Sequence, residues 1–247
     1  MYVSVDSLPE LTPEYQHAQQ QAVQEAKVVY QSEIVRQRPN DYGTIFIWSL
    51  FGLFSLWLMW TAVSDNLWTL AIIILCLTVS ILLYLYYAGN PDVKQTVTLT
   101  EKGMIVTELT LVPDACFAAL RYSGYVGVAI SIIGVVLVGP MMFVGAGAGL
   151  LMSFKMAGVV NRPRQRVRPF PPHTNYRIYI VPECRYKNGL LQWHMSPMID
   201  PEVEGEKMEA IYRENRIFYF SRYAASPKEQ KQFLQHLRQL VTVIEEE

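Results

Sequence analysis

Two long runs without a charged residue stand almost back to back in the first third of the chain, at Gly43–Ser64 and Leu67–Ala88. Each holds about 22 residues and would span roughly 33 Å as an α-helix, enough to cross the hydrocarbon core of a bilayer. Only Asp65 and Asn66 separate them. The sequence therefore predicts a tight antiparallel hairpin of two transmembrane helices over residues 42–88. A buried hairpin in a soluble protein is the disfavoured alternative.

Aromatic residues support this hairpin because they stand where its helices would meet the membrane surfaces. Tyr42 opens the first helix, and three tyrosines between residues 84 and 87 close the second, so they would share one surface. Trp60 and Trp68 flank the turn and would share the other. Such paired belts are typical of interfacial anchors.

Basic residues predict the orientation of the hairpin. They flank both runs, whereas the turn at Asp65 has none. These flanking residues are Lys27, Arg36, Arg38, Lys94 and Lys102. Because Lys and Arg collect on the cytosolic side, both ends of the hairpin are expected inside. The first forty residues also lack the apolar segment of a secretory signal. We expect an integral protein of the bacterial cytoplasmic membrane with both termini cytosolic.

A third uncharged block, Ser123–Phe154, exceeds one span in length and falls short of two. A Gly-Pro pair at residues 139–140 divides it, and proline disfavours a straight helix there. A single kinked crossing would leave the basic residues 155–168 outside, against the positive-inside pattern. We expect a shallow re-entrant hairpin; the single crossing and burial in a soluble or oligomeric core are alternatives. Gly145 and Gly149, in GxxxG spacing, are its candidate helix-packing residues.

Four arginines alternate with other residues in a basic, proline-rich linker at residues 159–172, namely Arg162, Arg164, Arg166 and Arg168. In an extended chain, residues two apart share a side, so these guanidinium groups would form one row beside the membrane. Such a row is a candidate contact for anionic lipid head groups. The plainer alternative is a topological anchor without a specific ligand. Nucleic acid is not expected as a partner, because the net charge is only −1 and no aromatic residues interleave.

The polar remainder of the chain predicts mixed helices and strands. Thr12 and Pro13 form a helix start, and the helix is expected to reach about Arg38. Lys94–Thr100 and Met104–Leu111 read as a strand pair across a short turn. Further strands are expected at Tyr176–Val181, Leu190–His194, Met208–Tyr212 and Ile217–Phe220, the last two as a pair.

A capping box at residues 226–229 opens a final helix. Its apolar residues recur at helical spacing and include Phe233, Leu237 and Leu240. The expected fold class is therefore an α+β membrane protein: a transmembrane hairpin plus a cytosolic β-rich domain, interrupted by the glycine-rich apolar hairpin and closed by the C-terminal helix. The expected divisions are 1–41 (juxtamembrane helix), 42–88 (transmembrane hairpin), 89–122 (first part of the β-rich domain), 123–158 (third apolar segment), 159–172 (linker) and 173–247 (second part of the domain).

Motifs for catalysis, cofactors and metals are missing from the sequence. The histidines are dispersed and none has metal-ligand spacing: His17, His173, His194 and His236. The acidic stretch Asp200–Glu206 is expected to be a solvated loop. No ionisable residue lies within the apolar blocks, which disfavours a pump or secondary transporter. We expect no cofactor, no metal and no catalytic residues, and regard enzymatic activity as the weaker alternative.

The stretches VKQTVTLTEKGMIVTEL and NRIFYFSRYAASPKEQKQFLQHLRQLV resemble bacterial pleckstrin-homology-like domain proteins with a transmembrane hairpin. This resemblance implies a small strand-rich barrel closed by a helix, acting in membrane association or assembly. The expected function is a non-enzymatic binding, scaffold or assembly factor at the cytosolic face, with an immunity factor among the possibilities. A membrane-bound lipid-acting enzyme and an accessory subunit of a transport or secretion complex are the alternatives. The bilayer, anionic head groups and a membrane protein or second copy are the expected partners.

Overall fold

A computed structural model describes residues 2–37, 42–89, 91–139, 151–171, 173–200 and 202–245. By its contacts the chain divides into two compact units. Unit 1 combines Met1–Pro39, Val93–Leu109 and Pro163–Glu247, and unit 2 combines Asn40–Asp92 and Thr110–Arg162.

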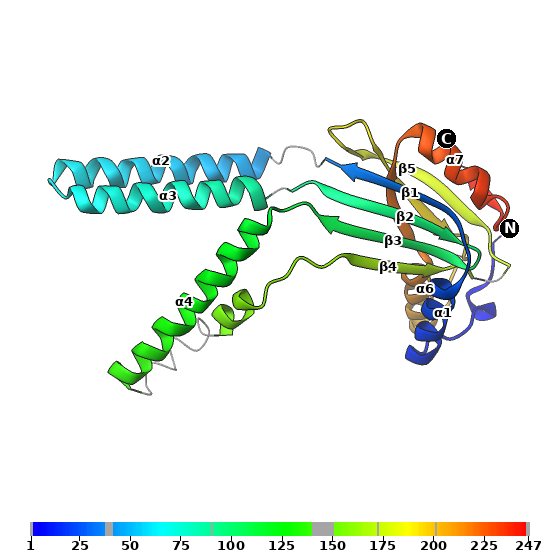
Figure 1. The fold of residues 1–247 in the computed structure, drawn as a ribbon. Helices are drawn as coiled ribbons and strands as arrows, with labels where there is room; N and C mark the ends of the chain where they lie inside the picture. Colours follow the sequence, from blue (N-terminus) through cyan, green and yellow to red (C-terminus); the bar gives the residue numbers. More distant parts are fainter. Residues whose placement is uncertain are drawn as a thin grey trace. The chain divides into compact units, whose positions relative to one another are not determined.

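Unit 1 contains a four-stranded sheet in the order β1-β2-β3-β4 (Figure 1). Its strands are β1 (Val28–Arg36), β2 (Val93–Thr100), β3 (Gly103–Thr110) and β4 (Arg164–Pro169). β1 pairs with β2 and β3 pairs with β4, both antiparallel. The strand pair expected after the second apolar run is confirmed as β2 and β3. Alternate residues of β2 and of the first half of β3, including Val97 and Val106, are buried on one face of the sheet.

Both apolar inserts stand in connections at the same end of this sheet. One joins β1 to β2 and the other joins β3 to β4, whereas Glu101 and Lys102 form the short turn at the opposite end. Alternate connections of an antiparallel meander lie at the same end of the sheet. The pairing therefore requires each insert to return to the sheet end that it left.

A second four-stranded sheet has the order β7-β6-β5-β8. Its strands are β5 (Tyr176–Arg185), β6 (Leu191–Pro197), β7 (Ser221–Ala225) and β8 (Val243–Glu245). β8 pairs parallel with β5, and the other neighbours are antiparallel. The side chains between the two sheets form the main core, with Leu99, Met104, Tyr176, Met195 and Leu237 fully buried in it.

The predicted C-terminal helix is confirmed as α7 (Pro227–Leu237), which begins with the expected capping box. Ser226 Oγ accepts a hydrogen bond from the Glu229 backbone N–H, and the Glu229 carboxylate accepts one from the Ser226 N–H. Phe233 and Leu237 bury one face of the helix in the main core. The helix does not close the chain, however, because β8 follows it and joins the second sheet.

Three secondary-structure predictions were wrong. The first helix, α1 (Pro13–Glu25), ends before the β-branched pair Val28 and Val29, which begins β1. The pair of strands expected between residues 208 and 220 is one helix, α6 (Glu206–Tyr219). Part of the expected linker is strand β4, which gains its hydrogen bonds from β3.

Unit 2 consists of long apolar helices. α2 (Tyr42–Ser64) and α3 (Trp68–Ala88) lie side by side as the expected hairpin (Figure 1). α4 (Asp114–Val138) opens the third block, and residues 151–157 are helical again. All three long helices have the length and composition to cross a membrane.

The apolar side chains of α2, α3 and α4 point mostly outward. Phe46, Trp57 and Ile72 each expose more than half of their surface, at 63%, 59% and 59%. The buried positions on α2 and α3 are small residues, including Ser55 and Ala62, which let the helices approach closely. Hydroxyl groups bond to carbonyl oxygens of their own helix, as Ser55 does to Phe51, so they need no water.

The third block turns back on itself with close helix packing. A Cβ on Gly124 would lie 2.6 Å from the Ala157 N and 2.7 Å from the Ser153 O, and one on Gly127 would lie 2.4 Å from the Ser153 hydroxyl. Glycine is therefore needed where residues 151–157 cross α4. Gly145 and Gly149, the predicted packing residues, lie outside the described part of the chain.

Candidate functional site

The arginines of β4 face the inside of unit 1. Directly opposed residues of an antiparallel pair share one face of the sheet. Arg168 is opposite Met104 and Arg166 is opposite Val106, and both of these β3 residues are buried in the main core. Arg164, Arg166 and Arg168 thus share one face of β4, and this face is the one that carries the buried side chains of β3.

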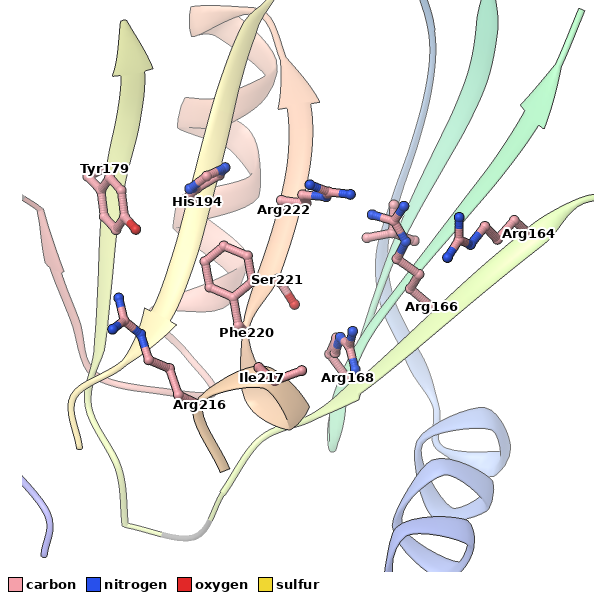
Figure 2. A pocket seen from close by; sticks show the side chains of 11 residues that line it. Arg164, Arg166, Arg168, Tyr179, His194, Arg216, Ile217, Phe220, Ser221 and Arg222 are labelled. Atoms are coloured by element: carbon pink, nitrogen blue, oxygen red, sulfur yellow. The ribbon is translucent and has the colours of Figure 1, made fainter. Parts of the chain in front are cut away.

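These arginines line a pocket of about 580 Å³ together with residues from β5, β6, β7 and α6. Figure 2 shows Arg222 on β7 pointing toward Arg166 on β4, with Arg168 and Arg164 on either side of Arg166 along the strand. The lining residues are Val106, Arg164, Arg166, Arg168, Tyr179, His194, Arg216, Ile217, Phe220, Ser221 and Arg222. We call this site the arginine pocket.

One carboxylate, that of Glu108 on β3, approaches the arginine pocket and is shared between two cations. It lies 3.4 Å from Arg166 and 3.3 Å from Arg36, and its side chain is only 12% exposed. Arg168 donates instead to the Phe218 carbonyl oxygen at 3.3 Å. In the part of the chain that the structure describes, the pocket therefore has a large excess of positive charge.

The pKa shifts agree with this excess. Burial lowers the pKa of Arg166 and Arg168, and the charge of Arg222 lowers both further. Burial, followed by Arg222, also lowers the pKa of His194 below its usual 6.5. Each shift reflects a protonated form that is less favourable here than in water. An anion in the pocket would reverse the electrostatic part of this penalty.

Rings form the wall of the pocket across from β4. His194 packs edge-on against Tyr179, with ring centres 5.5 Å apart, and edge-on against Phe220 at 5.1 Å. Ile217 stands at the pocket with 67% of its surface exposed. The pocket thus combines guanidinium groups, which bind carboxylate and phosphate oxygens in two-point fashion, with an apolar wall.

No cluster of three or more His, Cys, Asp or Glu residues that could hold a metal occurs within the described ranges. The four arginines singled out by spacing separate in the fold. Arg164, Arg166 and Arg168 line the pocket, whereas Arg162 belongs to unit 2. Sequence reasoning missed Arg216 and Arg222, since only the packing of α6 and β7 brings them to β4.

Comparison with known proteins identifies the family. The family model described as "TsiV2 immunity protein" matches residues 14–165, well over half of the chain. The chain belongs to the TsiV2 immunity protein family. The match runs from α1 through both apolar inserts to the start of β4.

A curated relative in the same family is the immunity protein TsiV2 of Vibrio cholerae serotype O1. It is 35% identical to this chain over 68 residues, a stretch that covers 28% of each protein. The chain thus spans little more than a quarter of the length of that relative. No solved structure matches.

Membership of the TsiV2 immunity protein family corrects the resemblance to pleckstrin-homology-like domain proteins, which was wrong. The strand pair that suggested it lies inside the matched residues 14–165. The second stretch, from Asn215 onward, does not have the expected form either. It begins as the last turns of α6, and the helix it contains is followed by another strand.

Proposed function

We propose that the chain is an immunity protein that protects the cell producing it by binding a cognate toxin effector, as part of type VI secretion. The family match over residues 14–165 carries this proposal. The same match favours immunity over the lipid-acting enzyme and the accessory transport subunit that the sequence left open. A binding role also fits unit 1, which presents an arginine pocket and an exposed apolar rim at Ile217.

We propose further that unit 2 anchors the protein in the cytoplasmic membrane and that unit 1 lies in the cytosol. The outward apolar side chains of α2, α3 and α4 support this, since soluble monomers rarely expose contiguous apolar patches of more than a few hundred Å². Basic residues flank the α2–α3 hairpin, and its turn has none. Because β1 and β2 pair along their length, the chain must cross an even number of times between them.

The same reasoning supports a returning path for the third block. β3 and β4 are paired neighbours, with Glu108 opposite Arg164. At the base of the insert, the Asn161 side-chain amide donates to the Thr110 carbonyl oxygen at 2.8 Å. A single crossing would separate these strands by a bilayer. We therefore propose that the block enters the membrane and comes back, with α4 packed on residues 151–157.

Anionic lipid head groups are a second proposed contact for the arginines of residues 162–168. Only the end of this stretch nearest the insert is placed to reach them. Arg162 and Arg164 stand next to the insert, where β4 begins. Both are exposed and free to reach a phosphate. Arg168 lies roughly 13 Å farther along the strand, so a flat membrane surface would not meet the whole row.

A protection experiment tests the immunity function. The gene would be deleted in its own organism, and the mutant would be mixed with parental cells that still deliver the toxin. Survival of the mutant should fall by orders of magnitude and should return when the full chain is supplied. A chain lacking residues 40–92 tests whether the anchor is needed. Undiminished survival of the deletion mutant, under conditions where the toxin kills unrelated cells, would refute the proposal.

A further inference from the structure

The arginine pocket holds more positive charge than the one carboxylate beside it, that of Glu108, can compensate. Arg164, Arg168, Arg216 and Arg222 form no ion pair within the described ranges, and the single nearby carboxylate, Glu108, is shared by Arg36 and Arg166. Arg166 and Arg168 are partly buried, and like charges held together at such positions destabilise a fold unless an anion joins them. Positions on β4 that face a core would normally carry apolar residues. The pocket is therefore built for a negatively charged ligand.

The spacing of the row identifies the shape of that ligand. Successive arginines on β4 are about 6.8 Å apart along the strand, and the row from Arg164 to Arg168 covers roughly 13 Å. One phosphate group is too small to touch all three. Acidic side chains two residues apart in an extended polypeptide have the same repeat. Arg222 points from β7 toward Arg166 and would share the carboxylate bound at the middle of the row.

The opposite wall suits a polypeptide for a second reason. His194 and Phe220 present ring surface beside the arginines, and Ile217 is exposed at the rim. The residues that alternate with acids in an extended segment point the other way and would meet these apolar groups or the solvent. Both the charged and the apolar groups that an alternating acidic segment would contact thus line the pocket.

We propose that the arginine pocket binds an extended acidic segment of the toxin effector, with its carboxylates on Arg164, Arg166, Arg168 and Arg222. This inference rests on the proposed immunity function. It assigns the partner chemistry to a continuous stretch in which Asp or Glu alternates with other residues.

The direct test uses the full chain in detergent and a labelled synthetic peptide in which glutamate alternates with valine. The matched probe carries glutamine in place of glutamate. The double variant Arg164→Gln/Arg222→Gln removes two cations that are exposed and hold no ion pair with any described residue. Arg213→Gln is the control, because Arg213 is an exposed arginine of α6 outside the pocket that pairs with Glu209.

The wild-type chain and Arg213→Gln should bind the glutamate peptide at least about tenfold more tightly than the glutamine peptide, and the double variant should lose this preference. Binding should weaken with salt. The double variant should also unfold at equal or higher denaturant concentration than wild type, because it relieves repulsion. A purely structural pair of arginines would lower that midpoint. Equal peptide binding by the double variant, or no preference for glutamate, overturns the proposal.

Two competitors separate the other sources of negative charge. Inorganic pyrophosphate and vesicles of phosphatidylglycerol are added to the peptide complex, with phosphatidylcholine vesicles as the neutral control. The proposal requires the peptide to stay bound when either competitor is present at the same concentration as the peptide. Displacement by pyrophosphate or by the anionic vesicles at that level assigns the pocket to phosphates instead and refutes the acidic segment.

The survival assay keeps this inference distinct from the immunity function. If a chain carrying Arg164→Gln/Arg222→Gln is present at normal level but no longer protects, the pocket is the effector site. If it protects fully while the deletion mutant dies, the immunity function stands and the pocket assignment fails. If the deletion mutant itself survives, the immunity function fails, and the peptide measurement alone decides whether the pocket binds acidic segments.

Discussion

Units 1 and 2 differ in which side chains they bury and which they expose. Unit 1 places Leu99, Met104 and Leu237 in a closed core. Unit 2 exposes large apolar side chains along α2, α3 and α4 and buries small or hydroxyl-bearing residues such as Ser55 and Ala62. The first arrangement suits water, and the second would suit lipid, as proposed above for unit 2.

Each unit contains one group of residues that departs from this pattern. In unit 1 the cationic row of β4 faces inward, where apolar residues would stabilise the fold more. In unit 2 the glycines of α4 face residues 151–157, where larger apolar residues would be expected against lipid. The first exception points to a ligand, and the second to a helix contact that depends on close approach.

The largest expected effect is an all-or-none labelling pattern. Single cysteines at positions 30, 65 and 165, in a chain whose three native cysteines are replaced, would be treated on intact cells with a membrane-impermeant thiol reagent. Only the cysteine at position 65 should react, because the proposed topology puts β1 and β4 in the cytosol and the α2–α3 turn outside the cytoplasmic membrane. Labelling after cell lysis is the control for access. Reaction of position 165 in intact cells would contradict the returning path of the third block.

A charge placed in each unit should separate folding from anchoring. Leu237→Asp puts an unpaired carboxylate in the main core and should destabilise unit 1 by roughly 4 kcal/mol or more. Protease sensitivity should rise while the protein stays in the membrane fraction. Leu77→Asp, on the exposed side of α3, should weaken insertion of this helix into the membrane by about 3 kcal/mol. The packing inside unit 1 should not change. Unchanged proteolysis of Leu237→Asp would mean that α7 packs less tightly than its burial implies.

Glu108→Gln tests whether the arginines on the inner face of β4 depend on this carboxylate. Removing this carboxylate leaves Arg36 and Arg166, with side chains 16% and 18% exposed, without their shared counter-charge. Breaking a buried pair from one side costs about 3–5 kcal/mol, reduced here because both cations still touch water. The denaturation midpoint of the detergent-solubilised chain should drop clearly. Glu209→Gln, which removes an exposed pair on α6, should shift it little.

The elements with strong local signals were predictable from the sequence. The α2–α3 hairpin follows from two uncharged runs, and α7 follows from a capping box before an amphipathic stretch. α6 was missed although Met208, Ile211 and Tyr212 recur at helical spacing and pack beside Val5. The prediction instead treated the two short apolar stretches 208–212 and 217–220 as a strand pair.

The arginine pocket shows why the site was only half predictable. The alternation of Arg164, Arg166 and Arg168 is local, so their common face could be inferred without knowing the fold. Their direction could not, since it depends on pairing with β3. Arg222 joins them from a strand more than fifty residues later, through sheet packing that no local pattern encodes.

Glycine replacements should measure the close contact in unit 2. Gly124→Leu would drive a side chain into the backbone of residues 153–157 and should destabilise the α4 contact by about 1–3 kcal/mol. Gly52→Leu is the matched control, because a Cβ there meets nothing within 4 Å and faces outward on α2. The thermal unfolding midpoint of the detergent-solubilised chain would report the contact. Equal midpoints in both variants would indicate that the helices do not pack this closely.

The smallest expected effect concerns His194, whose pKa links the pocket charge to pH. Burial and then Arg222 lower this pKa below 6.5, and the Gln192 amide nitrogen lies 3.0 Å from Nε2, which fits an unprotonated ring that accepts a hydrogen bond. The unfolded chain therefore takes up this proton more readily than the folded one. The stabilising contribution of His194 is present above about pH 6.5 and is lost as the pH falls toward the folded pKa.

Arg222→Gln tests this link because it removes one cause of the shift and leaves burial in place. The pKa of His194, followed by the NMR shifts of its ring, should move upward toward 6.5 but remain below it. The loss of stability on acidification should shrink by the same proportion. Arg213→Gln, outside the pocket, should leave the His194 titration unchanged. A pKa that does not respond to Arg222→Gln would mean that the two side chains lie farther apart than the arginine pocket requires, and would weaken the case for a single anion held between β4 and β7.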